Sequence, residues 1–596
     1  MKKLAVLDIE CYPNYFLLAI KGHESKKLLT FETTTRLATA ECSKIRGIMR
    51  KYTTFGFNSL KYDLPMLTYA LAGASAAQLY NASKDIIEKN QPAWMTYRNL
   101  NLDAPTWDHF DISEPSPAVM ISLKNYGTRV GSKKLQDLPF DPHLALTPDQ
   151  MYEIKLYCEN DLDVTIDLYD AISDRIALRE TMSSQYGMDL RSKSDAQIAE
   201  TVISSELHKV GVVATKPELP EGYRAKYKAP DFISFESDEL QELKLLIEGI
   251  SFQTQANGQV KMPKELAARK IVIGSTTYKM GIGGLHSQEK SLSVVSDGEN
   301  VMRNADVASY YPAIILGQGL YPKHLGKKFL TIYRKIVETR IKAKHEGNKL
   351  VADSLKITIN GSFGKFGSKY SKLYSPDLLL ATTITGQLCL LMLIEQLEVN
   401  DIPVMSANTD GVEYYCPRDK VSLAEAIIFD WELLTGYDME HGEYRALHAA
   451  NVNNYVAVYD GYTKAKGIYA ETTLSKGLQT PIVYEAIRKY LLDGSSIEMT
   501  INACTVVNDF LSARTVKGGA VWRNNYLGKM VRWYYSTSGE SIHYKLNNNK
   551  VPKSDGARPM MDILDALPED LDYQWYIDEA VSKLKDLGVE YYVNQN

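Results

Sequence analysis

The chain opens on a run dominated by apolar residues, Leu4-Ala-Val-Leu-Asp-Ile-Glu10, which predicts a buried β-strand close to the N-terminus. Successive side chains of a strand point to opposite faces, so the two acids of the run, Asp8 and Glu10, are predicted to share one face. Burying two carboxylates together costs free energy unless they bind something positive. The pattern therefore predicts a strand that presents a charged site.

A second apolar pattern predicts a β-hairpin in the second half of the chain. The run Ile402-Pro-Val-Met-Ser-Ala407 is largely apolar, and the segment 412–416 alternates as a half-buried strand does. Asp410-Gly411 between the two runs is a strong hairpin signal, in which Gly411 is expected to adopt a positive φ. A plain surface turn is the alternative, because Asp is a good turn former.

Helical spacing predicts two helices ahead of this hairpin, over 329–345 and 350–361. Each carries one polar pair four residues apart, Arg340 with Lys344 and Lys356 with Asn360. The two pairs can face one groove. The alternative is a solvated basic face.

The composition predicts a soluble, globular chain of several domains, with 596 residues, 45% of them hydrophobic and 24% charged. The N-terminus is too short and too acidic for a signal peptide. The apolar stretch 378–394 contains three Thr, a Gly and a Gln, so a buried helix is expected there rather than a membrane span. The six Cys form no CxxC pair, which argues against structural zinc and disulfides and fits a reducing cytoplasm.

The charge is unevenly distributed, although the net value of −5 argues against nucleic acid as a partner. Residues 323–349 and 514–558 each hold nine Lys or Arg against two acids. Aromatic residues interleave with the second basic segment: Trp522, Tyr526, Trp533, Tyr534, Tyr535 and Tyr544. Basic and aromatic side chains together suit a nucleic-acid strand. A solvated face over a small aromatic core is the alternative.

Three acid-bearing stations follow one another in the first third of the chain. They are Asp8-x-Glu10, then Asn58 with Tyr62-Asp63, then Tyr157 with Asp161 on a predicted helix. In this order they resemble the DEDDy type of 3′→5′ exonuclease domain, over roughly residues 1–190. The resemblance implies two Mg²⁺ ions held by Asp8, Glu10, Asp63 and Asp161, with Tyr157 orienting the attacking water. It also implies that Asn58, Tyr62, Ser122 and Leu123 contact single-stranded DNA.

Three further motifs resemble motifs A, B and C of family B DNA polymerases. They are DVASYYP at 306–312, KITINGSFG at 356–364 and NTD at 408–410. The resemblance implies that Asp306 and Asp410 hold two metal ions for nucleotidyl transfer. Motif C has Asn408 where the family usually has an acid, and motif B has Gly361 and Phe363 in place of Ser and Tyr.

The same resemblance implies contacts with nucleotide and DNA. Arg340, Lys344, Lys356 and Asn360 would hold the triphosphate, and Tyr311 would lie under the sugar and exclude a 2′-hydroxyl. Gly283 and Gly284 would approach the template, and Lys464 and Lys466 would bind the primer. Gly283 and Gly284 also suit a plain glycine-rich turn.

The resulting expectation is a multidomain α/β and α+β chain, with an RNase H-like exonuclease domain and a right-hand polymerase of palm, fingers and thumb. The expected ranges are exonuclease 1–190, connector and linker 191–295, palm 296–325 and 371–480, fingers 326–370 and thumb 481–596. The resemblance is to compact bacteriophage polymerases, and implies a primer–template and dNTPs as ligands and Mg²⁺ as cofactor, for which Mn²⁺ can substitute. We expect a monomer in the cytoplasm of a bacterial host, with no membrane association; accessory replication proteins are left open.

Two other functions remain open at this point. One is a DEDDy exonuclease whose polymerase half binds DNA but has lost synthesis, as Asn408 would suggest. The other is a non-enzymatic nucleic-acid-binding subunit, against which six acids in metal-site patterns argue.

Overall fold

The structure is a computed structural model that describes residues 2–118 and 121–592, and it divides into two compact units. Unit 1 comprises Met1–Ser194, Thr472–Ile482 and Cys504–Tyr576. Unit 2 comprises Asp195–Glu471, Val483–Ala503 and Ile577–Asn596. The expected multidomain, mixed α/β architecture is confirmed at this level.

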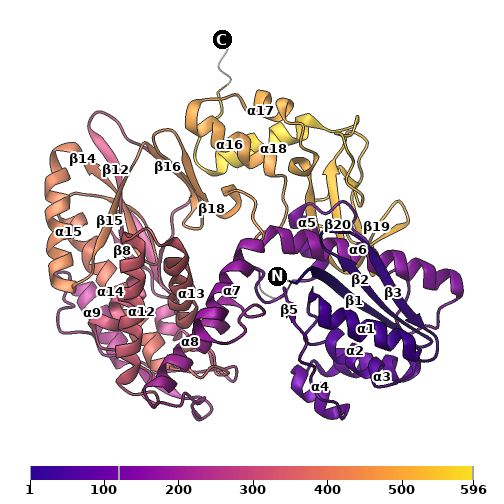
Figure 1. The fold of residues 1–596 in the computed structure, drawn as a ribbon. Coiled ribbons are helices and arrows are strands. Elements are labelled where there is room, and N and C mark those ends of the chain that lie inside the picture. The colour runs from indigo at the N-terminus through magenta and orange to yellow at the C-terminus, as the bar shows by residue number, and fades with distance from the viewer. Residues whose placement is uncertain (1, 119–120, 593–596) are drawn as a thin grey trace. The chain divides into compact units, whose positions relative to one another are not determined.

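Unit 1 is built on a five-stranded sheet in the order β3-β2-β1-β4-β5 (Figure 1). Its strands are β1 (Leu4–Tyr12), β2 (Tyr15–Gly22), β3 (Leu28–Thr33), β4 (Thr53–Gly56) and β5 (His109–Asp111). β1 pairs antiparallel with β2 and parallel with β4. Seven helices follow in chain order: α1 (Thr39–Lys51), α2 (Asp63–Leu71), α3 (Ala76–Lys89), α4 (Ala93–Asn99), α5 (Leu123–Val130), α6 (Pro148–Ala171) and α7 (Ser173–Tyr186).

Helices cover both faces of this sheet, and β1 shows why. Leu7 and Ile9 pack into a core formed with α1, α2 and α3. Val6 and Tyr12 pack on the other side, in a core formed with α5 and α6. Because side chains alternate along a strand, Asp8 and Glu10 share the face that α6 covers.

The C-terminal part of unit 1 is a four-stranded sheet in the order β21-β19-β20-β22. Its strands are β19 (Ser512–Trp522), β20 (Asn525–Tyr535), β21 (His543–Tyr544) and β22 (Ala557–Pro559). The guanidinium of Arg532 is fully buried and donates hydrogen bonds to the carbonyls of Ser132 and Lys133. A buried guanidinium that satisfies backbone carbonyls replaces the hydrogen bonds it loses to water, so Arg532 fastens this sheet to the segment after α5.

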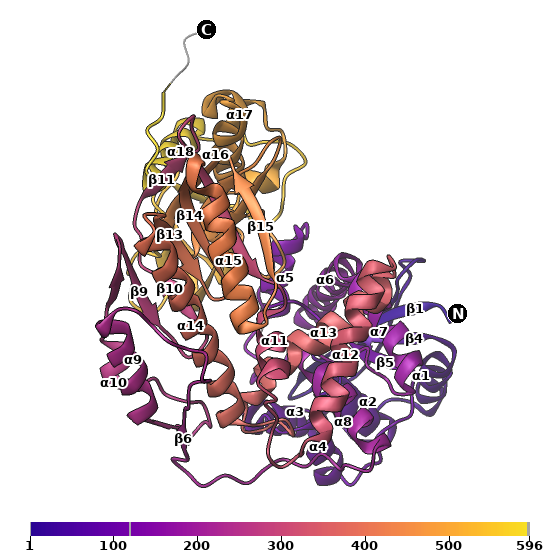
Figure 2. The same cartoon turned by 90° about the vertical axis from the view of Figure 1, so that its left-hand side faces the viewer.

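Unit 2 is built on a seven-stranded antiparallel sheet in the order β15-β12-β14-β13-β10-β9-β8 (Figure 2). Its strands are β8 (Ile271–Ile273), β9 (Thr276–Met280), β10 (Leu285–Ser287), β12 (Asn300–Val307), β13 (Val404–Asn408), β14 (Gly411–Pro417) and β15 (Met439–Tyr444). A four-stranded sheet in the order β11-β16-β17-β18 adjoins it, with β11 (Leu292–Val295), β16 (Ala446–Asn451), β17 (Asn454–Val458) and β18 (Thr463–Lys466). A small pair, β6 (Arg224–Lys226) with β7 (Ser251–Gln253), completes the strands of this unit.

The helices of unit 2 include a long apolar one, α14 (Pro376–Val399), which packs together with α15 (Val421–Thr435) against β13 and β14 of the large sheet (Figure 2). The other helices are α8 (Asp195–Lys209), α9 (Asp238–Gly249), α10 (Lys264–Ala267), α11 (Tyr310–Gly317), α12 (Lys328–His345), α13 (Lys349–Phe366) and α17 (Ile497–Ala503). Two more, α16 (Pro481–Asp493) and α18 (Tyr573–Asp586), contain the boundary between the units. Of the helices in the described residues, α14 alone is long and apolar enough to cross a membrane, but 83% of its most apolar window is buried, as the sequence predicts.

The predicted helix pair and hairpin are confirmed, with two local corrections. The second helix of the pair continues to Phe366, five residues past the predicted end at Gly361. The hairpin turn consists of Thr409 and Asp410, and the positive φ of 65° falls on Thr409 instead of Gly411. None of the six Cys forms a disulfide, as the sequence predicts.

The boundaries of the two compact units differ from those of the predicted domains. Residues of the predicted thumb, 481–596, fall into both units, and the predicted connector contributes β8, β9 and β10 to the large sheet of unit 2. The division into palm, fingers and thumb stays a prediction.

Candidate active sites

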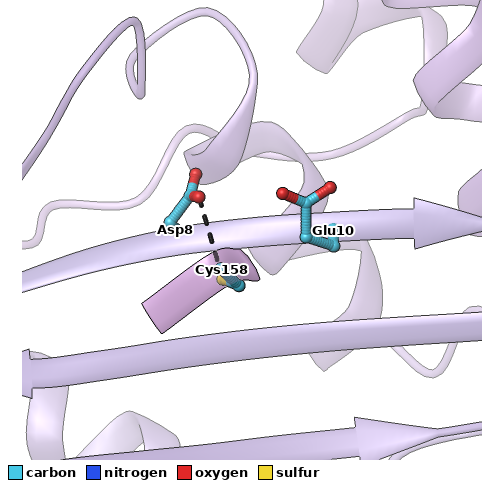
Figure 3. Close-up of side chains that lie close together, drawn as sticks. All are labelled: Asp8, Glu10 and Cys158. Carbon is cyan, nitrogen blue, oxygen red and sulfur yellow. Dashed lines mark hydrogen bonds between the residues drawn. The ribbon is translucent and has the colours of Figure 1, made fainter. Parts of the chain in front are cut away.

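Unit 1 brings three side chains together on the face of β1 that α6 covers. The carboxylates of Asp8 and Glu10 rise from one side of the strand, and Cys158 of α6 lies beside them (Figure 3). One possible ligand atom from each of the three lies within 4.8 Å of the others. The Cys158 thiol donates a hydrogen bond to Asp8 Oδ2 at 3.7 Å.

The other two predicted acids complete this group. Asp63 begins α2 and is 3% exposed, and its Oδ1 has no hydrogen-bond partner in the described structure. Asp161 lies on α6, one turn after Tyr157, and both side chains are buried. A buried carboxylate oxygen without a donor is costly, so Asp63 is poised to receive a positive ligand.

The pKa values of these acids reflect crowding of like charges in a buried place. Burial, and then the charge of Asp161, raises the pKa of Asp8 to about 7. Burial raises the pKa of Asp161 to about 6, against which the positive charge of Lys124 works. Burial and neighbouring carboxylates also hold the pKa values of Glu10 and Asp63 well above their usual range. Four acids so arranged repel one another once they are ionised, unless a cation lies between them.

Two residues next to these acids, Cys158 and Asp111, were not predicted from the sequence. Burial raises the pKa of the Cys158 thiol well above its ordinary value, so the group stays a protonated donor to Asp8 rather than a thiolate ligand. Asp111 of β5 accepts backbone hydrogen bonds from Asn58 and Leu60 and thereby fixes the loop that carries the second station. Its local signal was an acid ending an apolar run, HFDI at 109–112.

The predicted single-strand contacts of unit 1 occupy local structural roles as well. Asn58 is exposed and has a positive φ of 59°. The Tyr62 hydroxyl shares a hydrogen bond with Ser83 at 2.7 Å. Ser122 is the N-cap of α5 and accepts a hydrogen bond from the Asn125 amide, and Leu123 packs against the core of the sheet. Their contact with single-stranded DNA stays a prediction.

The second acid pair lies where β12 and the hairpin β13–β14 meet. Asp306 of β12 is directly opposite Gly411 of β14, the residue after Asp410. The Val307 amide donates to the Asp410 carbonyl at 2.7 Å, which fixes the hairpin tip to the end of β12. A Cβ on Gly411 would come within 1.8 Å of Asp306 Oδ1. Glycine is therefore required because Asp306 occupies the space, and the structure brings Asp306 and Asp410 together as predicted.

Two more polar side chains on this face were missed. Asn304 and Glu413 are direct cross-strand partners, 7% and 9% exposed, and one oxygen of each has no hydrogen-bond partner among the residues that the structure describes. Asn304 donates to Asp306 Oδ2 at 2.7 Å. Burial, followed by the charges of Asp306 and Glu289, raises the pKa of Glu413 to about 8. The polar face thus extends behind the predicted pair, and period 2 along β12, from Asp306 back to Asn304, could have indicated it.

Cations and an amide surround the Asp306–Asp410 pair. Burial raises the pKa values of both Asp306 and Asp410, and the charges of Lys464 and Lys466 on β18 work against these shifts. Asn408 donates from Nδ2 to the Val452 carbonyl at 3.1 Å, so its amide is committed to holding the turn. The predicted primer lysines therefore lie within electrostatic reach of the acids.

The predicted nucleotide contacts occupy α11, α12 and α13. Arg340 donates to Ser309 Oγ at 3.0 Å, and Lys344 pairs with Glu440 at 3.7 Å. Lys356 and Asn360 lie one turn apart on the exposed side of α13. Two of these four side chains, Arg340 and Lys344, thus contact Ser309 and Glu440, and Glu440 lies directly opposite Asp306 on β15.

Tyr311 lies on the first turn of α11, after Asp306, and stacks on Phe363 of α13 with ring centroids 4.2 Å apart. Its hydroxyl donates to the carbonyl of Gly283. Gly284, next to it, packs against Thr409, whose side chain a Cβ would meet at 3.0 Å. The glycine segment is the turn between β9 and β10, and it lies beside the hairpin tip that carries Asp410.

Comparisons with known proteins give structural similarity but no match to a family model or a curated protein. Among solved structures, the chain is similar to the family B DNA polymerase from the hyperthermophilic archaeon Pyrobaculum calidifontis, at 13% identity and a TM-score of 0.40. The alignment covers 100% of this chain and 79% of that one.

Both acid groups fit a hard divalent cation. Their possible ligands are carboxylate and amide oxygens, which Mg²⁺ and Mn²⁺ prefer. The unpartnered oxygens of Asp63 and Glu413 and the raised pKa values of the acids are what a site built for a cation shows without one.

Proposed function

We propose that the chain is a family B DNA polymerase of the compact bacteriophage type, which extends a primer on a DNA template and proofreads with a 3′→5′ exonuclease. Unit 1 would contain an RNase H-like exonuclease domain, and unit 2 a palm and fingers. The protein would act as a monomer in the cytoplasm of a bacterial host, in the replication of a phage genome.

The observation that carries the proposal is the presence of two separate acid groups, each built on the central sheet of its own unit. Asp8 and Glu10 share one face of β1, and Asp306 meets Asp410 at the end of β12. Phosphodiester hydrolysis and nucleotidyl transfer both need paired divalent cations. Two such groups in one chain suit opposed reactions on the same DNA.

In the exonuclease site, Asp8, Glu10, Asp63 and Asp161 would hold Mg²⁺. The bound cations would supply positive charge to the scissile phosphate and lower the pKa of the attacking water. Burial, and then the charge of Asp161, keeps the pKa of Tyr157 well above its ordinary value. The phenol is therefore neutral, and its hydroxyl can orient a water by hydrogen bonding. Asn58 and Tyr62 would hold the unpaired 3′ end.

In the synthesis site, Asp306 and Asp410 would hold Mg²⁺, for which Mn²⁺ can substitute. Arg340, Lys344, Lys356 and Asn360 would hold the triphosphate of the incoming nucleotide. Tyr311 is held by its stacking on Phe363 and its bond to Gly283, so a ring fixed in this way would exclude a ribose 2′-hydroxyl. Lys464 and Lys466 would bind the primer, and the Gly283–Gly284 turn the template.

The experiment supplies a 5′-labelled primer–template with Mg²⁺, with and without dNTPs. We expect the wild-type protein to extend the primer with dNTPs and to shorten it without them. Asp8→Asn with Glu10→Gln removes two charges from the first site and keeps their shapes. It should slow shortening on the order of 1000-fold and spare extension, because several kcal/mol of transition-state stabilisation are lost.

Asp410→Asn is the reciprocal variant and should remove extension while shortening continues. Shortening by the wild-type protein in both conditions would favour an exonuclease with a synthesis-deficient polymerase half. Absence of both reactions, with DNA still bound, would favour a non-enzymatic binding subunit. Normal extension by Asp410→Asn would contradict the metal assignment.

A further inference from the structure

Lys124 lies against the candidate exonuclease tyrosine, although it belongs to none of the acid stations. Its Nζ donates a hydrogen bond to the Tyr157 hydroxyl at 2.7 Å and lies 4.7 Å from the centroid of the Tyr157 ring. The ammonium therefore occupies one lone pair of the phenol oxygen. The phenol keeps its own proton to donate elsewhere, and Asp161 lies one turn further along α6.

Asp137 holds Lys124 from the other side. Asp137 Oδ1 pairs with Lys124 Nζ at 3.4 Å, and both side chains are 20% exposed. The second oxygen, Oδ2, accepts hydrogen bonds from the Tyr526 hydroxyl at 3.1 Å and the Lys529 amide at 3.2 Å. A carboxylate held at both oxygens has little freedom to turn away from Lys124.

Both of these donors belong to β20 and lie 389 and 392 positions from Asp137 in the sequence, but within the same compact unit. Gly528 lies between them and has a φ of +102°, and a Cβ there would come within 2.7 Å of Asp137 Cβ. The strand can approach Asp137 only because this position lacks a side chain. The contact between Asp137 and β20 therefore depends on the Asp137 carboxylate and on the glycine at position 528.

We infer that Lys124 and Asp137 are positioning residues for Tyr157, and that β20 sets them through Tyr526. The inference rests on the proposed exonuclease function and deepens it. The inference gives the basic and aromatic segment 514–558 a role in the exonuclease site. Its position in the second half of the sequence would suggest a role in the polymerase site alone. Without Lys124 the Tyr157 hydroxyl would be less well fixed, and the attacking water would no longer be held in the orientation that hydrolysis needs.

The test measures kcat and KM for shortening a single-stranded 5′-labelled oligonucleotide in Mg²⁺, for Lys124→Met, Lys124→Arg, Asp137→Asn and Tyr526→Phe. Affinity for the same oligonucleotide is measured separately by fluorescence anisotropy in EDTA. Lys133→Met is the matched control, because Lys133 has a 74% exposed side chain that, within the described part of the chain, pairs only with the exposed Asp565.

We expect Lys124→Met to lower kcat about 100-fold, since a misplacement near 1 Å of a catalytic group has an effect of this size. Asp137→Asn and Tyr526→Phe should lower kcat about 10-fold, because Lys124 remains but is less well held. Lys124→Arg should recover part of the loss. KM, the affinity in EDTA and primer extension should stay at the wild-type level throughout, as should every property of Lys133→Met.

A double variant decides whether β20 acts through the lysine. Tyr526→Phe should have no further effect on kcat in the Lys124→Met background, since groups that act in series are not additive. Independent losses that multiply, or wild-type kcat in Lys124→Met, would overturn the inference while the exonuclease function stands. Failure of the wild-type protein to shorten DNA in Mg²⁺ would instead overturn the proposed function and this inference with it.

Discussion

At the scale of single residues, Asn408 shows how a departure from a motif can be structural. Its side-chain amide donates to the Val452 carbonyl at 3.1 Å and its Oδ1 accepts from the Thr409 hydroxyl. A carboxylate at this position would lose the first bond and face a carbonyl oxygen. It would also add a negative charge beside Asp410. The asparagine therefore stabilises the turn that presents the acid.

Asn408→Asp is accordingly expected to destabilise unit 2 by about 1–3 kcal/mol, the cost of leaving a buried acceptor unpaired. The loss is measured as the change in denaturant midpoint in EDTA. Asn453→Asp is the matched control, since it adds the same charge on a neighbouring exposed turn where, among the described residues, the side chain makes no hydrogen bond to the hairpin. Equal stability of the two variants would show that the Val452 contact contributes nothing.

At the scale of elements, the hairpin β13–β14 delivers Asp410 only because Gly411 leaves room for Asp306. Gly411→Ala should displace Asp306 or the hairpin tip, because the new Cβ would come within 1.8 Å of Asp306 Oδ1. We expect primer extension to fall at least about 100-fold, as a shift near 1 Å in a catalytic group does. Shortening by unit 1 should be unchanged.

Gly298→Ala provides the control for this substitution. Gly298 lies in the turn before β12, has no atom within 4 Å of an added Cβ and has no positive φ. Extension by Gly298→Ala should equal that of the wild-type protein. Normal extension by Gly411→Ala would mean that Asp306 does not need its present position for synthesis.

The elements also show what sequence can and cannot predict. Asp8 and Glu10 were predictable because the period of a strand is local and rigid. The end of α13 was not, since Gly361 normally weakens a helix. Here a Cβ at Gly361 would come within 2.5 Å of the Asp195 carbonyl, so close packing of α8 requires glycine and the helix continues past it. Packing between distant segments overrode the local signal.

The contact between Asp137 and Tyr526 was beyond prediction for a related reason. No periodicity connects residues 389 positions apart, and an Asp in a loop carries no sign of its partner. The basic and aromatic composition of 514–558 suggested nucleic acid but gave no indication of the unit it would join. Compact packing assigns 504–576 to the unit that carries Asp8.

At the scale of the whole molecule, the clustered acids make stability depend on pH and metal together. The pKa values of Asp8 and Asp161 are raised from 3.8 to about 7 and about 6. Below about pH 4 these groups are protonated in both the folded and the unfolded state, and their shifts cost nothing. Between about pH 4 and 7 the unfolded chain releases these protons first, so unfolding becomes more favourable as pH rises.

We therefore expect the contribution of this site to metal-free stability to fall as pH rises from about 4 to about 7 and to stay low above that range. Mg²⁺ or Mn²⁺ should restore stability at pH 8 and have little effect at pH 5, because cations bind the ionised acids. The measurement is the melting temperature in EDTA and in excess metal at both pH values.

Asp8→Asn with Glu10→Gln should melt higher than the wild-type protein in EDTA at pH 8, by about 5 °C for one or two kcal/mol of relieved repulsion. At pH 5 the two proteins should differ much less. A variant that melts at or below the wild-type temperature at pH 8 would show that these acids are not held against their own repulsion, and the case for a cation between them would fail.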